Sequence, residues 1–241
     1  MSYGYESNGF EVAAQSAASE RAGFLRNTYA HLAGALFALV GIEAVLLNTV
    51  TVDQVFGVLG RSPFGMLGVM LAFMAGSWVA QSFAMQRVNR AMQYFGLALY
   101  VLLEALILLP MFFYAELKFP GQVGGLTQSA GILSLCIFGG LSAAVLTTGS
   151  DYSFLRTAVM MGCFLATGLI ICSAIFGFTL GILFSFAMVA LLCACILYQT
   201  SEIMHRFPSD MYVAAALMLF SSIVTLFFYI FRILMAFQER D

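Results

Sequence analysis

Long apolar runs restrict the fold of this chain more than any other feature. The longest extends over about 44 residues, from Phe154 to Leu197, with Arg156 as its one early charge. About 20 helical residues cross a bilayer core of about 30 Å, so a run of this length is expected to turn back on itself. The glycines within Phe176–Gly181 weaken a helix and predict the position of that turn.

Five further apolar runs are each long enough for one crossing. The chain is 62% hydrophobic and 9% charged, with a mean hydropathy of +0.96, which excludes an ordinary soluble domain. We therefore predict an all-α membrane protein, a seven-transmembrane-helix bundle occupying residues 24–236. The five further runs are Phe24–Leu47, Phe64–Phe83, Tyr94–Tyr114, Thr127–Thr147 and Met211–Arg232.

The segments outside the bundle are a polar tail at residues 1–23 and a short C-terminal tail at residues 237–241. The first lacks the charged region and apolar core of a cleavable signal peptide. Basic residues favour one side of the seven spans by six to four, which predicts a cytoplasmic N-terminus and an external C-terminus in a bacterial inner membrane. The six are Arg21, Arg26, Arg87, Arg90, Arg156 and Arg206, and the four are Arg61, Lys118, Arg232 and Arg240.

The last run carries small and polar residues along one helical face. Lipid offers no partner for hydroxyl groups, so this helix is expected to lie in the centre of the bundle. Two interpretations remain open: small residues permit close helix packing, or the hydroxyls line a polar pathway. The pathway would include Ser221, Ser222 and Thr225.

Two glutamates lie within the predicted spans, where an ionisable group usually faces a cavity or a partner. Glu104 is midway along the third span and is the first candidate for a functional carboxylate; the alternative is a neutral acid hydrogen-bonded to a neighbouring helix. Glu43 is in the outer part of the first span, where it either lines the pathway or reaches interfacial water.

Four charged residues on the expected cytoplasmic side are candidates for a latch. Asp151 with Arg206, or Glu202 with Arg156, would form ion pairs that hold the inner mouth closed. Helix capping and solvated surface charge explain the same residues without a latch.

Small residues one helical turn apart predict where helices approach closely. They are Gly34 with Ala38, Ala72 with Gly76, Gly139 or Gly140 with Ala143 or Ala144, and Ala190 with Ala194.

Several function classes find no support in the residues. Clustered Lys and Arg are absent at a net charge of -2, so no nucleic-acid partner is expected. The five cysteines lie in apolar runs and the two histidines are far apart in sequence, which predicts no metal site and no cofactor. A serine elbow, an HExxH motif and paired aspartates within the spans are all missing, so no enzyme is predicted.

Three stretches carry a family resemblance. Tyr198–Ser201, followed by His205 and Tyr212–Leu217, resembles the C-terminal signature of the Bax inhibitor-1/YccA family. Phe24–Tyr29 resembles the entry to the family's first helix, and Ser150–Leu155 resembles its turn before the fifth.

The resemblance implies two alternatives. Members that are bacterial calcium leaks share a proton between two aspartates, but the matching positions here are Gln199 and Ser222, so the di-aspartyl pH sensor is missing. The pattern is closer to the YccA branch, whose enterobacterial member is similar to a substrate and modulator of the membrane protease FtsH. The resemblance implies that the protease would bind an exposed N-terminal tail, and residues 1–20 have a similar character. We therefore expect either a leak for calcium or other cations, or a quality-control protein that binds FtsH and its regulators.

Overall fold

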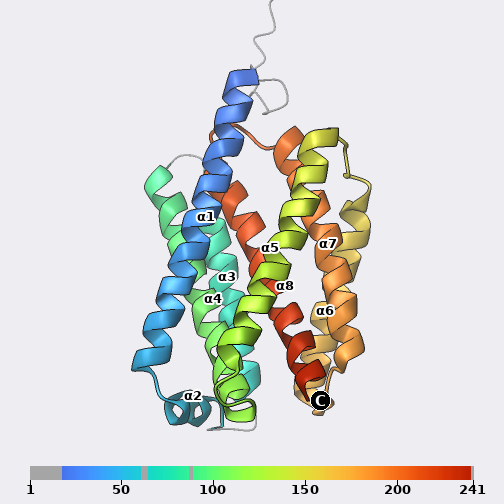
Figure 1. Cartoon of the computed structure of the whole chain (residues 1–241). Helices are drawn as coiled ribbons and strands as arrows, with labels where there is room; N and C mark the ends of the chain where they lie inside the picture. The colour runs from blue at the N-terminus through green and yellow to red at the C-terminus, as the bar shows by residue number, and fades with distance from the viewer. Residues whose placement is uncertain (1–17, 61–64, 87–88, 240–241) are drawn as a thin grey trace, which may run out of the picture.

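The computed structural model describes residues 18–60, 65–86 and 89–239, which form eight helices (Figure 1). Seven of them are long and apolar enough to cross a membrane, which confirms the predicted seven-helix bundle. The helices are α1 (Ala18–Thr49), α2 (Val52–Leu59), α3 (Gly65–Ala84), α4 (Arg90–Lys118), α5 (Val123–Thr148), α6 (Leu155–Phe176), α7 (Ile182–His205) and α8 (Tyr212–Gln238).

The long helices alternate in direction, so the bundle has two ends. We call them the upper end, where α1 and α8 begin, and the lower end, where α2 lies and α8 finishes (Figure 1). An ion pair joins Lys118, the last residue of α4, to Glu239, which directly follows α8, at the lower end. Much of the predicted tail at residues 1–23, together with Arg61, Arg87 and Arg240, lies outside the described residues.

The last helix is central, as predicted. Helix α8 packs against α1, α3, α4, α5 and α7, and 72% of the residues in its most apolar stretch of 18 are buried. The corresponding share for α6 is 11%, because α6 packs mainly on α7 at the edge of the bundle (Figure 1). The face of hydroxyl residues on α8 therefore points at neighbouring helices.

The long apolar run turns back where its glycines predict. Helix α6 ends at Phe176 and α7 begins at Ile182. Gly177 adopts a positive φ of 72°, a conformation that side chains with a Cβ rarely tolerate, and its N–H donates to the carbonyl of Ser173 at 2.9 Å. This glycine cap ends the helix and allows the chain to reverse.

Helix α2 was not predicted. It is only eight residues long and lies across the lower end between α1 and α3 (Figure 1). The side chain of Gln54 accepts a hydrogen bond from the backbone N–H of Thr51 at 3.0 Å, which supports the start of the helix. A helix of about two turns is hard to distinguish from a loop by hydrophobic periodicity alone.

Two of the four predicted close approaches are wrong, whereas Gly76 does lie against Leu103 of α4. Gly34, Ala38, Gly139 and Gly140 are exposed on the outside of the bundle. Among the described glycines, the tightest approach to another backbone is at Gly96 of α4, where an added Cβ would lie 2.5 Å from the carbonyl oxygen of Ala80 on α3 and 2.6 Å from the nitrogen of Ala84. Spacing identifies small residues, but helix rotation decides which of them face a neighbour.

Candidate functional site

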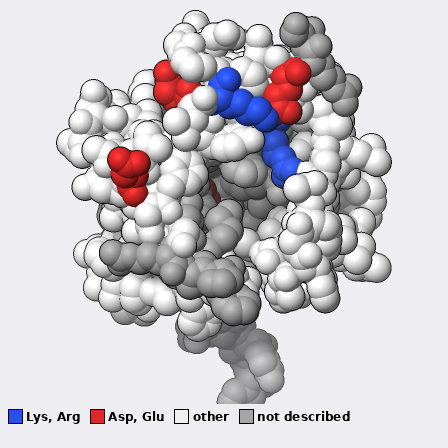
Figure 2. Space-filling model, turned by 90° about the horizontal axis from the view of Figure 1, so that it is seen from below, with Lys and Arg blue, Asp and Glu red and all other residues white. Residues whose placement is uncertain are grey.

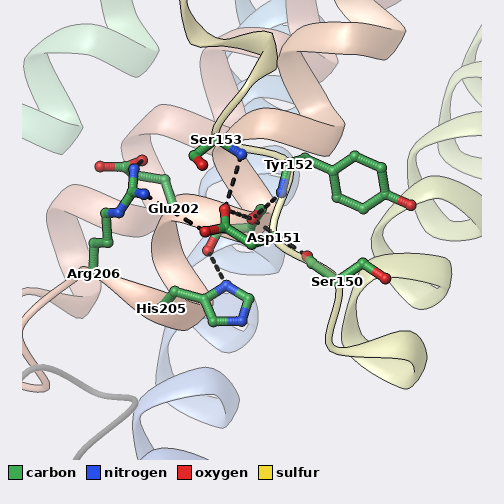
Figure 3. A network of polar contacts seen from close by, with 8 residues as sticks. Ser150, Asp151, Tyr152, Ser153, Glu202, His205 and Arg206 are labelled. Carbon is green, nitrogen blue, oxygen red and sulfur yellow. Dashed lines mark hydrogen bonds and ion pairs between the residues drawn. The ribbon is translucent and has the colours of Figure 1, made fainter.

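A serine of α7 organises the polar network at the upper end (Figure 3). The hydroxyl oxygen of Ser201 accepts a hydrogen bond from the N–H of Tyr152 at 2.9 Å, and it lies 3.4 Å from the carbonyl of Ser150 and from Oδ1 of Asp151. Nδ1 of His205 lies 2.9 Å from the carbonyl of Ser201. The turn before α6 is thus fastened to the end of α7.

Arg206 joins the acidic residues of this network. Its guanidinium lies 3.6 Å from Asp151 and 3.1 Å from Glu202, so the expected pairing of Asp151 with Arg206 is present. The expected pairing of Glu202 with Arg156 is wrong: Glu202 lies one helical turn before Arg206 on the end of α7 and pairs with it instead. Arg156 belongs to the start of α6.

The surroundings of Asp151 favour the ionised form of its carboxyl group. The backbone N–H of Ser153 donates to its Oδ1 at 2.9 Å, and this bond, the Ser153 hydroxyl and the nearby Arg206 lower the pKa of the Asp151 carboxyl below its usual value. Asp151 does not cap α6 directly, because the residue at the N-cap is Phe154.

Below this network, hydroxyl and amide side chains connect α5, α7 and α8. Ser142 and Thr200 are both buried, with their hydroxyl oxygens 3.4 Å apart, and the hydroxyl of Ser222 donates to Oε1 of Gln199 at 2.8 Å. The two positions that would carry aspartates in a di-aspartyl sensor are therefore in contact, as an amide and an alcohol. Neither titrates, so this contact holds helices together without sensing pH.

The other hydroxyls of the α8 stripe bond to their own helix. Ser221 donates to the carbonyl of Met218 at 2.9 Å, and Thr225 donates to the carbonyl of Ser221 at 2.7 Å. This arrangement satisfies the hydroxyl protons in an apolar setting and leaves the oxygens free to accept. It is compatible with helix packing and with a polar pathway.

Glu104 lies in the interior at 5% exposure. Tyr100, one turn earlier on α4, lies near both the Glu104 carboxyl and Ser221 of α8. Its ring packs against Phe220 of α8, with the ring centroids 6.1 Å apart. The predicted candidates Glu104 and Ser221 are thus brought together through a tyrosine that the sequence analysis did not nominate. An aromatic residue four positions before a buried acid was the available signal.

Glu43 does not reach the surface. Its side chain is 7% exposed, and neither carboxyl oxygen has a hydrogen-bond partner among the described residues. It lines a cavity of about 680 Å³ between α1, α4, α5 and α8 in the lower half of the bundle. Figure 2 shows the lower end of the molecule, which carries few charged side chains among the described residues and is hollowed near its centre.

The cavity contains a second acid that the sequence analysis missed. Glu116 lies just beyond the predicted end of the third span at Tyr114, but α4 continues to Lys118 and carries Glu116 into the lining. Its Oε1 also accepts a hydrogen bond from the N–H of Gly121 at 3.0 Å.

Comparison with known proteins identifies the family. Residues 21–239 match the family model described as inhibitor of apoptosis-promoting Bax1. A stretch of 111 residues is 37% identical to the protein of Pseudomonas aeruginosa named uncharacterized protein PA2604, and the aligned part covers 46% of this chain and 50% of that relative. No solved structure matches. Since the family model extends over nearly all of the seven-helix bundle, the chain belongs to the Bax inhibitor-1 family of multi-pass membrane proteins.

Proposed function

We propose that this protein is a membrane leak for calcium or other cations, that the described structure is its closed state, and that the bundle does no enzymatic chemistry. The observation that carries the proposal is the buried Glu104 of α4, one turn from Tyr100, which packs against Phe220 of the central helix. Carboxyl groups within a bundle commonly mark ion pathways.

The acids of α4 give this pathway a direction. Glu104, Leu108, Phe112 and Glu116 recur every four residues, so each lies one turn from the next in a row that drifts slowly around α4. The last three line the cavity together with Glu43, while Glu104 lies one turn, about 6 Å along the axis, above Leu108. Cations would enter the cavity from the lower end, pass Glu116 and Glu43, and reach Glu104 next.

Two barriers account for closure. Leu39, Leu108 and Ile223 are buried at the inner side of the cavity and would have to separate before an ion passed. At the upper end, the Ser201 contacts and the pairing of Arg206 with Asp151 fasten the turn before α6 to α7. This network replaces the aspartate pair as the proposed latch.

The upper end is proposed to face the cytoplasm of a bacterial cell. Among the described residues, the basic side chains at this end outnumber those at the lower end, which favours a cytoplasmic location. The relative from Pseudomonas aeruginosa supports a bacterial inner membrane. The upper residues are Arg21, Arg26, Arg90, Arg156 and Arg206, and the lower ones are Lys118 and Arg232.

Calcium flux into liposomes containing the purified protein tests the proposal at pH 6, 7 and 8. Flux above that of empty liposomes is expected, and Glu104→Gln, which removes the charge but keeps the shape, should lower it at least about fivefold, equivalent to about 1 kcal/mol. Glu20→Gln makes the same chemical change at an exposed position of α1 and should leave flux unchanged.

Flux equal to that of empty liposomes at every pH would overturn the leak, as would equal flux in the wild type and Glu104→Gln. A modulator of FtsH in membrane protein quality control would then be the remaining proposal. That alternative relies on the family resemblance and on a tail whose first 17 residues lie outside the described residues.

A further inference from the structure

The cavity beside Glu43 has the chemistry of a ligand site. Its volume of about 680 Å³ falls within the range of about 300–1,000 Å³ that holds drug-sized ligands. Most of its lining is leucine, valine and phenylalanine, with a few polar groups. An apolar cavity with a small number of polar groups is the usual form of a small-molecule site.

The unpartnered carboxyl of Glu43 points to the head group of the ligand. Glu43 is only 7% exposed, and neither of its carboxyl oxygens has a hydrogen-bond partner among the described residues. A buried carboxylate costs several kcal/mol unless a cation or donor accompanies it. A protonated amine supplies both the opposite charge and N–H donors.

Two aromatic rings add to the preference for a cation. Phe112 of α4 and Phe227 of α8 both line the cavity, with ring centroids 6.2 Å apart. The faces of aromatic rings attract ammonium groups, an effect that is strongest where water is excluded. A carboxylate head group would gain nothing from these rings and would be repelled by Glu43.

The two acids of the lining lie in its lower part, together with the apolar Leu47 and Val123. Glu43 and Glu116 occupy the part nearer the lower end of α1 and α4, whereas Leu36 and Leu108 lie further toward the middle of the bundle. A ligand that satisfies both parts is an amphiphile, with its charged head toward the lower end and its chain directed inward.

The cavity opens toward lipid between α1 and α5. These two helices both pack on α8, and their backbones lie apart. Their side chains meet nearer the upper end, where the rings of Tyr29 and Phe138 are 6.4 Å apart. Val40 of α1 and Leu135 of α5 line the cavity and remain 66% and 52% exposed, so the opening is apolar. A hydrophobic molecule dissolved in the bilayer could enter here without passing through water.

We propose that this cavity binds a single-chain lipophilic amine, with the ammonium group paired to Glu43 and flanked by Phe112 and Phe227, and with the alkyl chain among the leucines. The volume suits one chain better than the two of a phospholipid. The same cavity is the lower mouth of the proposed leak, but the binding inference does not require transport, and its test measures no flux.

Photolabelling tests the site directly. The protein is reconstituted in phosphatidylcholine nanodiscs with a dodecylamine analogue that carries a diazirine in its chain. Saturable labelling of α1 and α5 residues in the lining is expected, with excess dodecylamine competing and excess dodecanoate failing to compete. Glu43→Gln should weaken apparent binding at least about tenfold, and Glu20→Gln should not change it.

A second variant leaves the carboxyl intact. Val40→Trp places a large side chain at the lipid-facing opening, on a position that is 66% exposed, and should also reduce labelling while leaving the melting temperature unchanged. Unchanged labelling of Glu43→Gln, equal competition by dodecanoate, or loss of labelling when phosphatidylethanolamine is added would each overturn the proposal of a single-chain amine paired to Glu43.

Discussion

Individual polar side chains at the upper end act through several contacts at once. Ser201 accepts from one backbone N–H and lies within reach of a carbonyl and a carboxylate, all on the turn before α6. Asp151 in turn orders its own turn through the N–H of Ser153 and meets Arg206. The turn and the end of α7 are therefore expected to move together rather than independently.

Acid should release this network. Because the pKa of Asp151 is lowered in the folded protein, its ionised form stabilises the fold above the pKa of the unfolded chain, and this stabilisation is lost as the pH falls through the folded value. Melting temperature measured from pH 8 to pH 2 should show an Asp151-dependent decrease below about pH 4. Between pH 6 and 8 this residue should contribute no pH dependence.

Asp151→Asn should remove that component of the profile. Asp53→Asn, on the exposed helix α2 at the opposite end of the bundle, is the matched control and should retain it. Superimposable profiles for the wild type and Asp151→Asn would mean that the network adds nothing to stability.

At the level of elements, α3 and α4 approach closely at one glycine. The backbone of α4 at Gly96 fits against Ala80 and Ala84 of α3, both of which are nearly fully buried. Backbones approach this closely only where a side chain is absent. The α3 and α4 pair also supports Tyr100 and Glu104, which follow Gly96 at one and two turns on the same helix face.

Gly96→Ala should therefore destabilise the protein by about 1–3 kcal/mol, because the new Cβ must displace backbone rather than a flexible side chain. Thermal unfolding in detergent measures the effect as a lower melting temperature. Gly34→Ala makes the same change in α1, where an added Cβ meets nothing within 4 Å, and should not lower it. A similar response of both variants would refute the packing argument.

For the molecule as a whole, the central position of α8 explains how one helix can touch both ends of the proposed pathway. It begins at the upper end near the Arg206 network, contacts Gln199 through Ser222, and lines the lower cavity with Ile223, Val224 and Phe227. A small displacement of α8 would therefore change contacts at the upper end, at Gln199 and in the lower cavity together.

Seven spans also make a prediction about topology. A fluorescent protein fused before Met1 should fluoresce in the bacterial cytoplasm, and alkaline phosphatase fused after Asp241 should be active outside it. Exchanging the two reporters should abolish both signals. Active phosphatase at the N-terminus would reverse the proposed orientation, and active phosphatase at both termini would contradict an odd number of spans.

Much of the candidate site could be anticipated from single residues, but most of its connections could not. Glu104, Gln199 and Ser222 were identifiable as polar groups within apolar runs. The contact of Gln199 with Ser222 was implied by the family resemblance. The pairing of Ser142 with Thr200 was not, because it joins residues 58 positions apart and depends on how α5 and α7 are rotated. The predicted partner of Glu202 was Arg156, but the structure pairs Glu202 with Arg206, because Arg206 lies one turn away at the end of the same helix.

The sequence by itself determined the number of spans, their approximate bounds, the turn at Gly177 and the central place of the last helix. The physical reason is that lipid cannot satisfy backbone polar groups, so each apolar run must form its own helix, and a helix rich in hydroxyls must face protein. Only the tertiary structure decided that Gly96 lies against α3, that Glu43 is buried without a partner, and that four helices enclose a cavity around it. These features depend on the rotation and separation of helices distant in sequence, which local periodicity does not specify.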